Sequence, residues 1–173
     1  MKIKHIILTL IFGLIGYGLI FYFRPFKPLD KSVSIDKIEV FKHKRRLDLI
    51  SNNQIIKSYK ISLGRVPKGH KEYEGDKKTP EGLYVINDKN PNSGYYKNIG
   101  ISYPNEIDTK HAESIGKSPG GSIKIHGIKN GFGWIGRFHL LFDWTLGCIA
   151  MTDREIDELY ENVKIGTPIE IKP

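Results

Sequence analysis

Residues 143–151, DWTLGCIAM, contain the single cysteine of this 173-residue chain. A glycine precedes Cys148, and small or apolar residues surround the pair. A cysteine thiol becomes a nucleophile when a nearby base or a positive environment makes its thiolate accessible. A buried cysteine without such a partner is inert and packs as a small hydrophobic residue. The stretch alone therefore leaves two interpretations open, a catalytic cysteine and a structural one.

A candidate base lies upstream, at the end of the stretch GSIKIHG (residues 121–127). Its alternation of polar and apolar residues predicts a strand that ends at His126. A histidine and a cysteine need only meet in space to form a catalytic pair. His139, nine residues before Cys148, is a rival base, but its apolar neighbours are equally typical of a core histidine. We therefore prefer His126.

The sequence around these residues resembles that of the L,D-transpeptidase (YkuD-type) catalytic domain family. That family's signature is a histidine, a spacer, and then Ser/Thr-x-Gly-Cys, which matches His126-Gly127 followed by Thr145-x-Gly147-Cys148. GDKKTPEG (residues 75–82) and ISYPN (residues 101–105) resemble two further segments of the family. Residues 144–171 resemble the C-terminal block of its proteobacterial, membrane-anchored branch. The resemblance covers about residues 36–171.

The resemblance implies a mainly β fold, a β-sandwich or meander of the L,D-transpeptidase type, with one or two short helices. It implies a cysteine-dependent acyl transferase that acts on peptidoglycan stem peptides through a thioacyl-enzyme in cell-wall remodelling, without a cofactor or a metal. Cys148 is then the nucleophile and His126 the proton donor and acceptor. The carbonyl of Gly127 orients the imidazole, and the backbone N–H groups of Gly147 and Cys148 bind the oxyanion.

Four further side chains are expected to contact the substrate: Tyr103, Trp144, Thr145 and Arg137. A packed core tyrosine is the alternative for Tyr103. The planar fork of Arg137 suits a substrate carboxylate, but a surface ion pair is the alternative there.

Two positions depart from the family pattern. Leu146 stands where many members have a second histidine, and Ala150 stands near the place of an arginine or asparagine. Because these positions lie near the acceptor, they leave the fate of the acyl-enzyme open. A peptidoglycan hydrolase, either an L,D-carboxypeptidase or an amidase, is the first alternative. A wall-binding module without chemistry is the second.

The composition indicates the fold class and the kind of partner to expect. The chain has 18 glycines, 9 prolines, 9 tyrosines and 8 phenylalanines, which favour strands and turns over a helical bundle. The net charge is +8, and residues after 30 account for about +5 of it, a mild excess. There is no arginine-rich tract or nucleic-acid-binding motif, so nucleic acid is not expected as a partner.

The first residues predict a membrane anchor. Residues 6–23 are uncharged and mostly apolar, and 18 residues are just enough to span a bilayer as a helix. No Ala-x-Ala-like cleavage site follows, which favours an uncleaved anchor. We predict an anchor with a basic head (1–24), a linker (25–35) and a catalytic domain (36–172). The protein would be a single-pass protein of the cytoplasmic membrane, with its catalytic domain facing the periplasm and cell wall.

Periodicity predicts the elements of the catalytic domain. Strands are expected over 37–42, 46–50, 55–64, 82–86, 98–103, 122–126 and 167–171. Thr152 and Glu155 have capping-box spacing and predict a helix that packs behind the cysteine. Residues 66–81 are expected to form a structured loop near the cleft, with Asp76 in an Asx-type turn. Residues 105–120 are expected to be a flexible excursion, and the basic run 42–46 an exposed hairpin tip.

Overall fold

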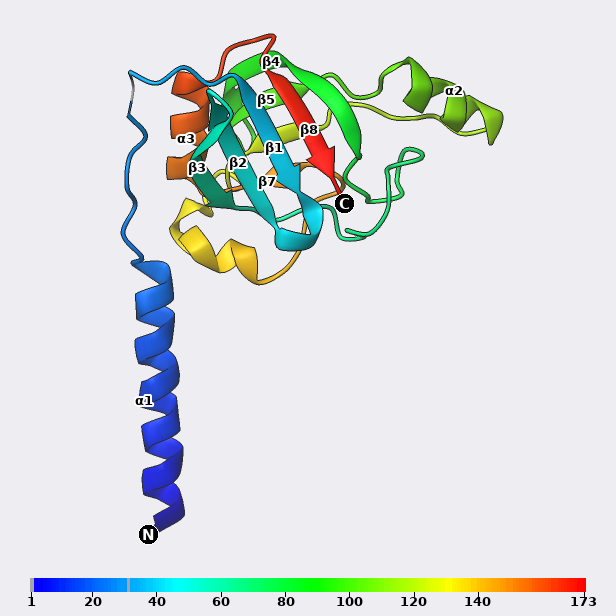
Figure 1. Cartoon of the computed structure of the whole chain (residues 1–173). Coiled ribbons are helices and arrows are strands. Elements are labelled where there is room, and N and C mark those ends of the chain that lie inside the picture. The colour runs from blue at the N-terminus through cyan, green and yellow to red at the C-terminus, as the bar shows by residue number, and fades with distance from the viewer. Residues whose placement is uncertain (1, 31) are drawn as a thin grey trace.

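A long apolar helix and a compact β domain make up the chain, whose computed structural model describes residues 2–30 and 32–173 (Figure 1). Helix α1 spans Lys2–Tyr22 and projects away from the domain. The strands of the domain are β1 (Lys37–Phe41), β2 (Arg46–Ser51), β3 (Gln54–Lys60), β4 (Gly82–Ser93), β5 (Tyr96–Ile101), β6 (Lys124–His126), β7 (Ile149–Ala150) and β8 (Pro168–Lys172). Its helical segments are the 3-10 helix η1 (Lys42–Lys44), α2 (Glu106–Ser114), the 3-10 segment η2 (Gly133–Leu141) and α3 (Asp153–Asn162).

The eight strands form one mixed sheet in the order β3-β2-β1-β8-β4-β5-β6-β7. Two neighbouring pairs, β1 with β8 and β6 with β7, are parallel, and the other pairs are antiparallel. The segment after β3 returns to the far edge, where Ser62 and Ala150 exchange backbone hydrogen bonds of 2.9 and 2.8 Å. The segment after β3 therefore links the two ends of the sheet.

Alternating apolar residues of the strands fill the interior. Each of the eight strands contributes at least one buried apolar side chain to a single cluster, and Ile156 and Leu159 of α3 close it from one side. Burial of such side chains contributes roughly 1.5–3 kcal/mol each. The prediction of a mainly β domain with one or two short helices is confirmed: α2 and α3 are the two α-helices of the domain, and the 3-10 segments η1 and η2 accompany them. The predicted capping box is also present, because Thr152 and Glu155 exchange hydrogen bonds at the start of α3.

Two sequence-based expectations about individual segments are wrong. The expected flexible excursion contains α2, which begins with a capping box between Asn105 and Asp108. Asp108 is buried, and its carboxylate accepts a hydrogen bond of 3.0 Å from the hydroxyl of Tyr84. The helical pattern of this segment is weak in the sequence, because a contact that stabilises the helix comes from Tyr84 on the distant strand β4.

The basic run is not wholly exposed. Lys42 is only 2% exposed, and its Nζ donates to the carbonyl oxygens of Gly69 and Thr79 and to the carboxylate of Glu81 at 2.6–2.8 Å. These bonds tie η1 to the loop 66–81. A buried lysine is recognisable only when its acceptors are known, and they lie 27 to 39 residues away in the sequence.

The connection after α1 packs on the domain. Leu29 is buried, and its N–H donates to the carboxylate of Glu158 on α3. The hydroxyl of Tyr22 donates to the carbonyl oxygen of Trp134 in η2 at 2.8 Å. Helix α1 itself is long and apolar enough to cross a membrane over Ile3–Tyr22, and none of that segment is buried by the rest of the protein.

Candidate active site

Cys148 lies directly before β7, at the exit of a tight turn. The hydroxyl of Thr145 donates to the carbonyl oxygen of Cys148 at 2.7 Å and accepts from the N–H of Gly147 at 3.2 Å. Gly147 has a φ of +136°, a conformation that side chains other than hydrogen rarely permit. The turn therefore holds Cys148 at the edge of a cavity of about 1030 Å³, where the residue is half-buried.

His126 is the last residue of β6 and lines the same cavity. Its Nδ1 lies 2.7 Å from the carbonyl oxygen of Gly127. Because a carbonyl oxygen only accepts, Nδ1 must carry the proton in this contact, and Nε2 of the neutral ring is left as an acceptor. The ring is fixed further by Tyr95 and Trp144, whose centroids lie 4.7 and 5.6 Å away.

The register of β6 and β7 brings the two residues to one face. Ile125 is paired with Ile149 and His126 with Ala150 in parallel strands. Side chains alternate along a strand, so His126 and Ala150 share a face, and Cys148, two residues before Ala150, continues it. Segments that are 22 residues apart in the sequence therefore deliver the thiol and the imidazole to the same cavity.

Burial sets the charge state of both groups. It lowers the pKa of His126, although the hydrogen bond with Gly127 acts in the opposite direction. It raises the pKa of the Cys148 thiol, although Lys124 beside it acts to lower it. Both directions favour a neutral thiol and a neutral imidazole near pH 7. In this conformation the thiol donates to the carbonyl oxygen of Ser122 at 3.6 Å.

The model of the L,D-transpeptidase catalytic domain (YkuD) matches residues 35–171. The chain belongs to this family. A curated relative, YafK of Escherichia coli (strain K12), provisionally named an L,D-transpeptidase, is 35% identical over 132 residues, which cover 73% of this chain and 46% of that protein. The chain thus spans about half the length of the curated relative that it matches.

Solved structures of L,D-transpeptidases and cell-shape proteins share the fold. The helical cell shape determining protein Pgp2 from Campylobacter jejuni is 26% identical, with a TM-score of 0.59 over 83% of this chain and 52% of that chain. An L,D-transpeptidase from Mycobacterium smegmatis is 13% identical, with a TM-score of 0.54 over 82% of this chain and 59% of that chain. The second similarity concerns the fold alone.

Two of the four expected substrate contacts of this L,D-transpeptidase domain lie at the cavity, Trp144 and Thr145. The other two do not. Tyr103 is buried in the core, where its ring packs edge-on against Tyr84 and its hydroxyl donates to the carbonyl oxygen of Pro119 at 3.0 Å. Arg137 does not line this cavity, and its guanidinium approaches the carboxylate of Glu155 at 3.7 Å. Tyr103 therefore fits the alternative of a packed core tyrosine, whereas the contact of Arg137 with Glu155 is mostly buried and is not the surface ion pair named as its alternative.

The expected oxyanion donors also need a correction. The N–H of Gly147 is engaged by the hydroxyl of Thr145, so it does not face the cavity as a free donor. Within the described part of the chain, the N–H of Cys148 has no hydrogen-bond acceptor. Gly147 therefore serves the turn through its conformation, and the N–H of Cys148 is the candidate oxyanion donor.

Glycine is required beside the base as well as beside the thiol. A Cβ on Gly127 would lie 2.7 Å from the carboxylate of Asp153 and 3.0 Å from the side chain of Tyr96. The same carboxylate accepts a hydrogen bond of 2.8 Å from the N–H of Ile128. The chain after His126 is thus held close to α3, with the Gly127 carbonyl directed at the imidazole.

Several cavity residues were not predicted from the sequence. Tyr95, in the turn between β4 and β5, stacks on Trp144 at 6.0 Å and so completes an aromatic wall around His126. The sequence signal that could have indicated Tyr95 as a cavity residue is an aromatic side chain next to a cluster of polar turn residues. Much of the opposite wall is apolar and comes from η2 and its neighbours: Phe132, Ile135, Phe138, Leu141, Phe142 and Leu146.

His139, the rival base, lines the cavity but is only 4% exposed. Burial lowers its pKa to about 4, and the neighbouring His126 and Arg137 act in the same direction. The indole N–H of Trp144 donates to its Nδ1 at 3.4 Å. His139 is therefore a neutral, buried histidine that accepts from Trp144 through Nδ1, while its buried Nε2 has no hydrogen-bond partner among the described residues.

The loop 66–81 packs against the Gly147-Cys148 turn. Its Asp76 accepts hydrogen bonds from the backbone N–H groups of Glu72, Tyr73 and Lys78 and from Lys71 Nζ at 2.7–3.3 Å. The Asp76–Lys78 contact is the predicted Asx-type turn. A Cβ on Gly147 would lie 2.8 Å from the Lys78 carbonyl oxygen, so the loop and the turn are in close backbone contact.

Proposed function

We propose that this L,D-transpeptidase domain is a cysteine acyltransferase that acts on peptidoglycan stem peptides through a thioacyl-enzyme at Cys148. The observation that supports this most is the parallel pairing of β6 and β7, which opens Cys148 and His126 onto one cavity, with the imidazole held through its Nδ1. Family membership supports the class of reaction, and the peptidoglycan substrate is inferred from it.

The first half-reaction forms the thioacyl-enzyme. Nε2 of neutral His126 takes the thiol proton, and the sulfur attacks an amide carbonyl of the stem peptide. The N–H of Cys148 donates to the developing oxyanion, a type of contact worth roughly 3–4 kcal/mol in acyl transfer. The tetrahedral intermediate then collapses, the imidazolium gives its proton to the leaving amine, and a thioester remains.

The second half-reaction releases the acyl group. An acceptor amine loses a proton to His126 as it attacks the thioester carbonyl, and the thiolate leaves and regains the proton from the imidazolium. When water takes the place of the amine, the same steps give a carboxypeptidase or an amidase. Leu146 is 66% exposed at the cavity and offers no hydrogen bond to an acceptor, so the acceptor is chosen by groups other than this side chain.

We further propose that α1 anchors the protein in the cytoplasmic membrane, with residues 36–172 as the catalytic domain on the side of the periplasm and cell wall. The helix is apolar over Ile3–Tyr22 and has no partner in the domain along most of its length, which supports a lipid environment. The name of the Campylobacter relative associates that protein with cell shape. A role in cell-wall remodelling is consistent with both.

Product masses test the proposal. The full-length protein is incubated with purified muropeptides, and the products are read by mass spectrometry. Cross-linked dimers are expected for transfer, whereas trimmed monomers would identify the hydrolase. Cys148→Ala and His126→Ala should each lose the thioacyl adduct, and Lys68→Gln, an exposed change outside the cavity, should keep it. Full turnover by either active-site variant, or wild-type binding without any product, would reject the enzyme.

A further inference from the structure

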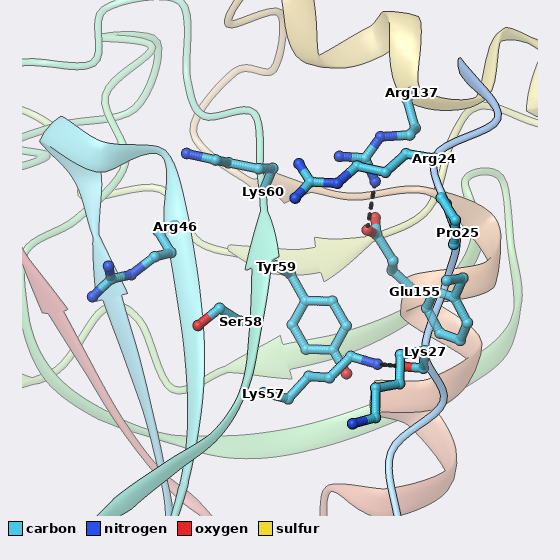
Figure 2. A pocket seen from close by; sticks show the side chains of 11 residues that line it. Arg24, Pro25, Lys27, Arg46, Lys57, Ser58, Tyr59, Lys60, Arg137 and Glu155 are labelled. Atoms are coloured by element: carbon cyan, nitrogen blue, oxygen red, sulfur yellow. Dashed lines mark hydrogen bonds and ion pairs between the residues drawn. The ribbon is translucent and has the colours of Figure 1, made fainter. Parts of the chain in front are cut away.

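A second cavity, of about 320 Å³, lies between the connection after α1 and the domain (Figure 2). Residues 24–27 of the connection form one side, and strands β2 and β3 with α3 and η2 form the other. Six basic side chains line it: Arg24, Lys27, Arg46, Lys57, Lys60 and Arg137. Glu155 is the one acidic residue among the lining residues.

Three of these six cations already have acidic neighbours. Arg46 pairs with Asp48 at 2.8 Å, and Lys57 pairs with Glu158 at 3.0 Å. Arg137 approaches Glu155 at a longer 3.7 Å. These pairs balance the charge of three of the lining cations but not of the other three.

The other three cations lack such a partner among the described residues. Among the residues that the structure describes, the side chains of Arg24, Lys27 and Lys60 take part in no ion pair. Figure 2 shows the guanidinium groups of Arg24 and Arg137 directed to the same end of the pocket, while Lys60 lies beside them on β3 with its Nζ directed away. Like charges that converge in this way repel one another unless an anion joins them.

Glu155 does not meet this need. Its Oε2 accepts from the N–H and the hydroxyl of Thr152 at 3.0 and 2.7 Å, which caps α3. In addition, the Nε of Arg137 is buried without an acceptor within the described residues. The pocket therefore holds more donors and more positive charge than the protein itself satisfies. A phosphate group suits it, because guanidinium groups bind phosphate oxygens in a planar fork.

The pocket lies next to the end of the apolar helix. Arg24 comes two residues after Tyr22, where α1 ends, and the Tyr22 ring packs on Phe138 of η2 with a centroid distance of 5.4 Å. Near this contact, Trp134, Leu141 and Phe142 are 65–71% exposed. Exposed tryptophan and apolar residues beside a membrane span, with basic residues just beyond it, are typical of a surface that meets lipid headgroups.

We propose that this pocket binds the phosphate group of an anionic phospholipid and so fixes the domain against the membrane that α1 enters. The proposal rests on the membrane placement of α1 and is independent of the chemistry at Cys148. The bound headgroup would hold the connection 24–27 against β3 and η2. It would thereby give the mouth of the catalytic cavity, which η2 also lines, a fixed orientation relative to the bilayer.

The test is lipid binding by the full-length protein in a neutral detergent. Phosphatidylglycerol or phosphatidylcholine is titrated in, and bound lipid is counted by native mass spectrometry. Wild type should bind its first phosphatidylglycerol at least tenfold more tightly than phosphatidylcholine. Arg24→Gln with Lys60→Gln should weaken that binding about 30-fold, since each basic side chain near anionic lipid is worth roughly a factor of five. Lys68→Gln with Lys164→Gln removes the same charge from exposed sites elsewhere and should retain wild-type binding.

Three outcomes would overturn the proposal. Wild type that binds both lipids equally has no phosphate-selective pocket, and this result does not depend on any variant folding. Equal losses in the two double variants would reduce the effect to overall charge. Displacement of phosphatidylglycerol by an equal concentration of inorganic phosphate would identify a site for soluble phosphate instead of lipid. Flotation of wild type with neutral liposomes and its turnover of muropeptides are measured in parallel, so that a failed anchor or a failed active site is recognised separately.

Discussion

The hydroxyl of Thr145 donates a hydrogen bond of 2.7 Å to the carbonyl oxygen of Cys148. The same hydroxyl accepts from the N–H of Gly147 at 3.2 Å. One side chain therefore closes the turn on both sides of Gly147, and the Cys148 N–H remains the oxyanion donor of the proposed mechanism. The Thr of the Thr-x-Gly-Cys motif thus shapes the site by holding the backbone.

Thr145→Val should lower stability and activity together. Loss of the hydroxyl leaves a buried N–H and a carbonyl without partners, at a cost of about 1–3 kcal/mol in the free energy of unfolding. Thr145→Ser keeps the hydroxyl and should remain within about 1 kcal/mol of wild type. Chemical denaturation of the full-length protein and muropeptide turnover measure the two effects. Equal turnover by the valine variant and wild type would show that the turn does not depend on this hydroxyl.

Gly147→Ala should disrupt the nucleophile turn. Its φ of +136° is strained for alanine, and the new Cβ would lie 2.8 Å from the Lys78 carbonyl oxygen and 3.1 Å from Ile123 Cδ1. Strain and overpacking together should cost about 2–5 kcal/mol of stability, with loss of thioacyl-enzyme formation. Gly94→Ala is the matched control, since an added Cβ there meets no atom within 4 Å. If both alanine variants unfold at the wild-type denaturant concentration, the close packing against Lys78 is incorrect.

Alkylation of Cys148 should depend on pH as expected for a thiol without a preformed ion pair. Burial raises the pKa of the Cys148 thiol, so the rate of reaction with iodoacetamide should still be rising at pH 9. Burial lowers the pKa of His126, and the base works in its neutral form, so the acid limb of kcat/KM should fall below pH 6.5. An alkylation rate that is already at a plateau between pH 5 and 8 would instead indicate a thiolate–imidazolium pair.

Asp76→Asn should destabilise the protein in a pH-dependent manner. Burial acts to raise the pKa of this carboxyl, but Lys71 and three backbone N–H groups outweigh it and hold the pKa below its usual value. Because the folded-state pKa is depressed, the stabilisation is fully present above the unfolded pKa of about 4 and is lost as the pH falls through the folded pKa. The variant should therefore lose about 1–3 kcal/mol at pH 7, and the gap should narrow below pH 4.

Glu113→Gln, at an exposed position on α2, removes the same charge and should leave stability nearly unchanged at every pH. Denaturant titrations at pH 3, 5 and 7 measure the three proteins. A constant gap between wild type and Asp76→Asn across this range would mean that the Asp76 carboxylate is not what ties the loop.

The local sequence pattern was sufficient to predict those strands and helices whose stabilising contacts lie close together in the sequence. The period-2 strands and the helix after Thr152 were predictable, because alternation and a capping box act within a few residues. Helix α2 was missed although Asn105 and Asp108 form a capping box, because its apolar residues show no helical period and its buried Asp108 is held by Tyr84 across 24 residues. Lys42 was misplaced for the same reason, because its charge is satisfied only by a distant loop.

By itself, the sequence determined the kind of domain, the apolar helix before it and the two residues, His126 and Cys148, on which the proposed chemistry depends. These follow from residue identity and short spacing, which the chain carries before it folds. Only the tertiary structure decided which neighbours act with them. In the folded protein, Tyr103 and Arg137 lie outside the catalytic cavity, and the N–H of Gly147 donates to Thr145. Arg24 and Lys60 line the second pocket. Such contacts join segments far apart in the chain, and only the packing of the folded chain brings their partners together.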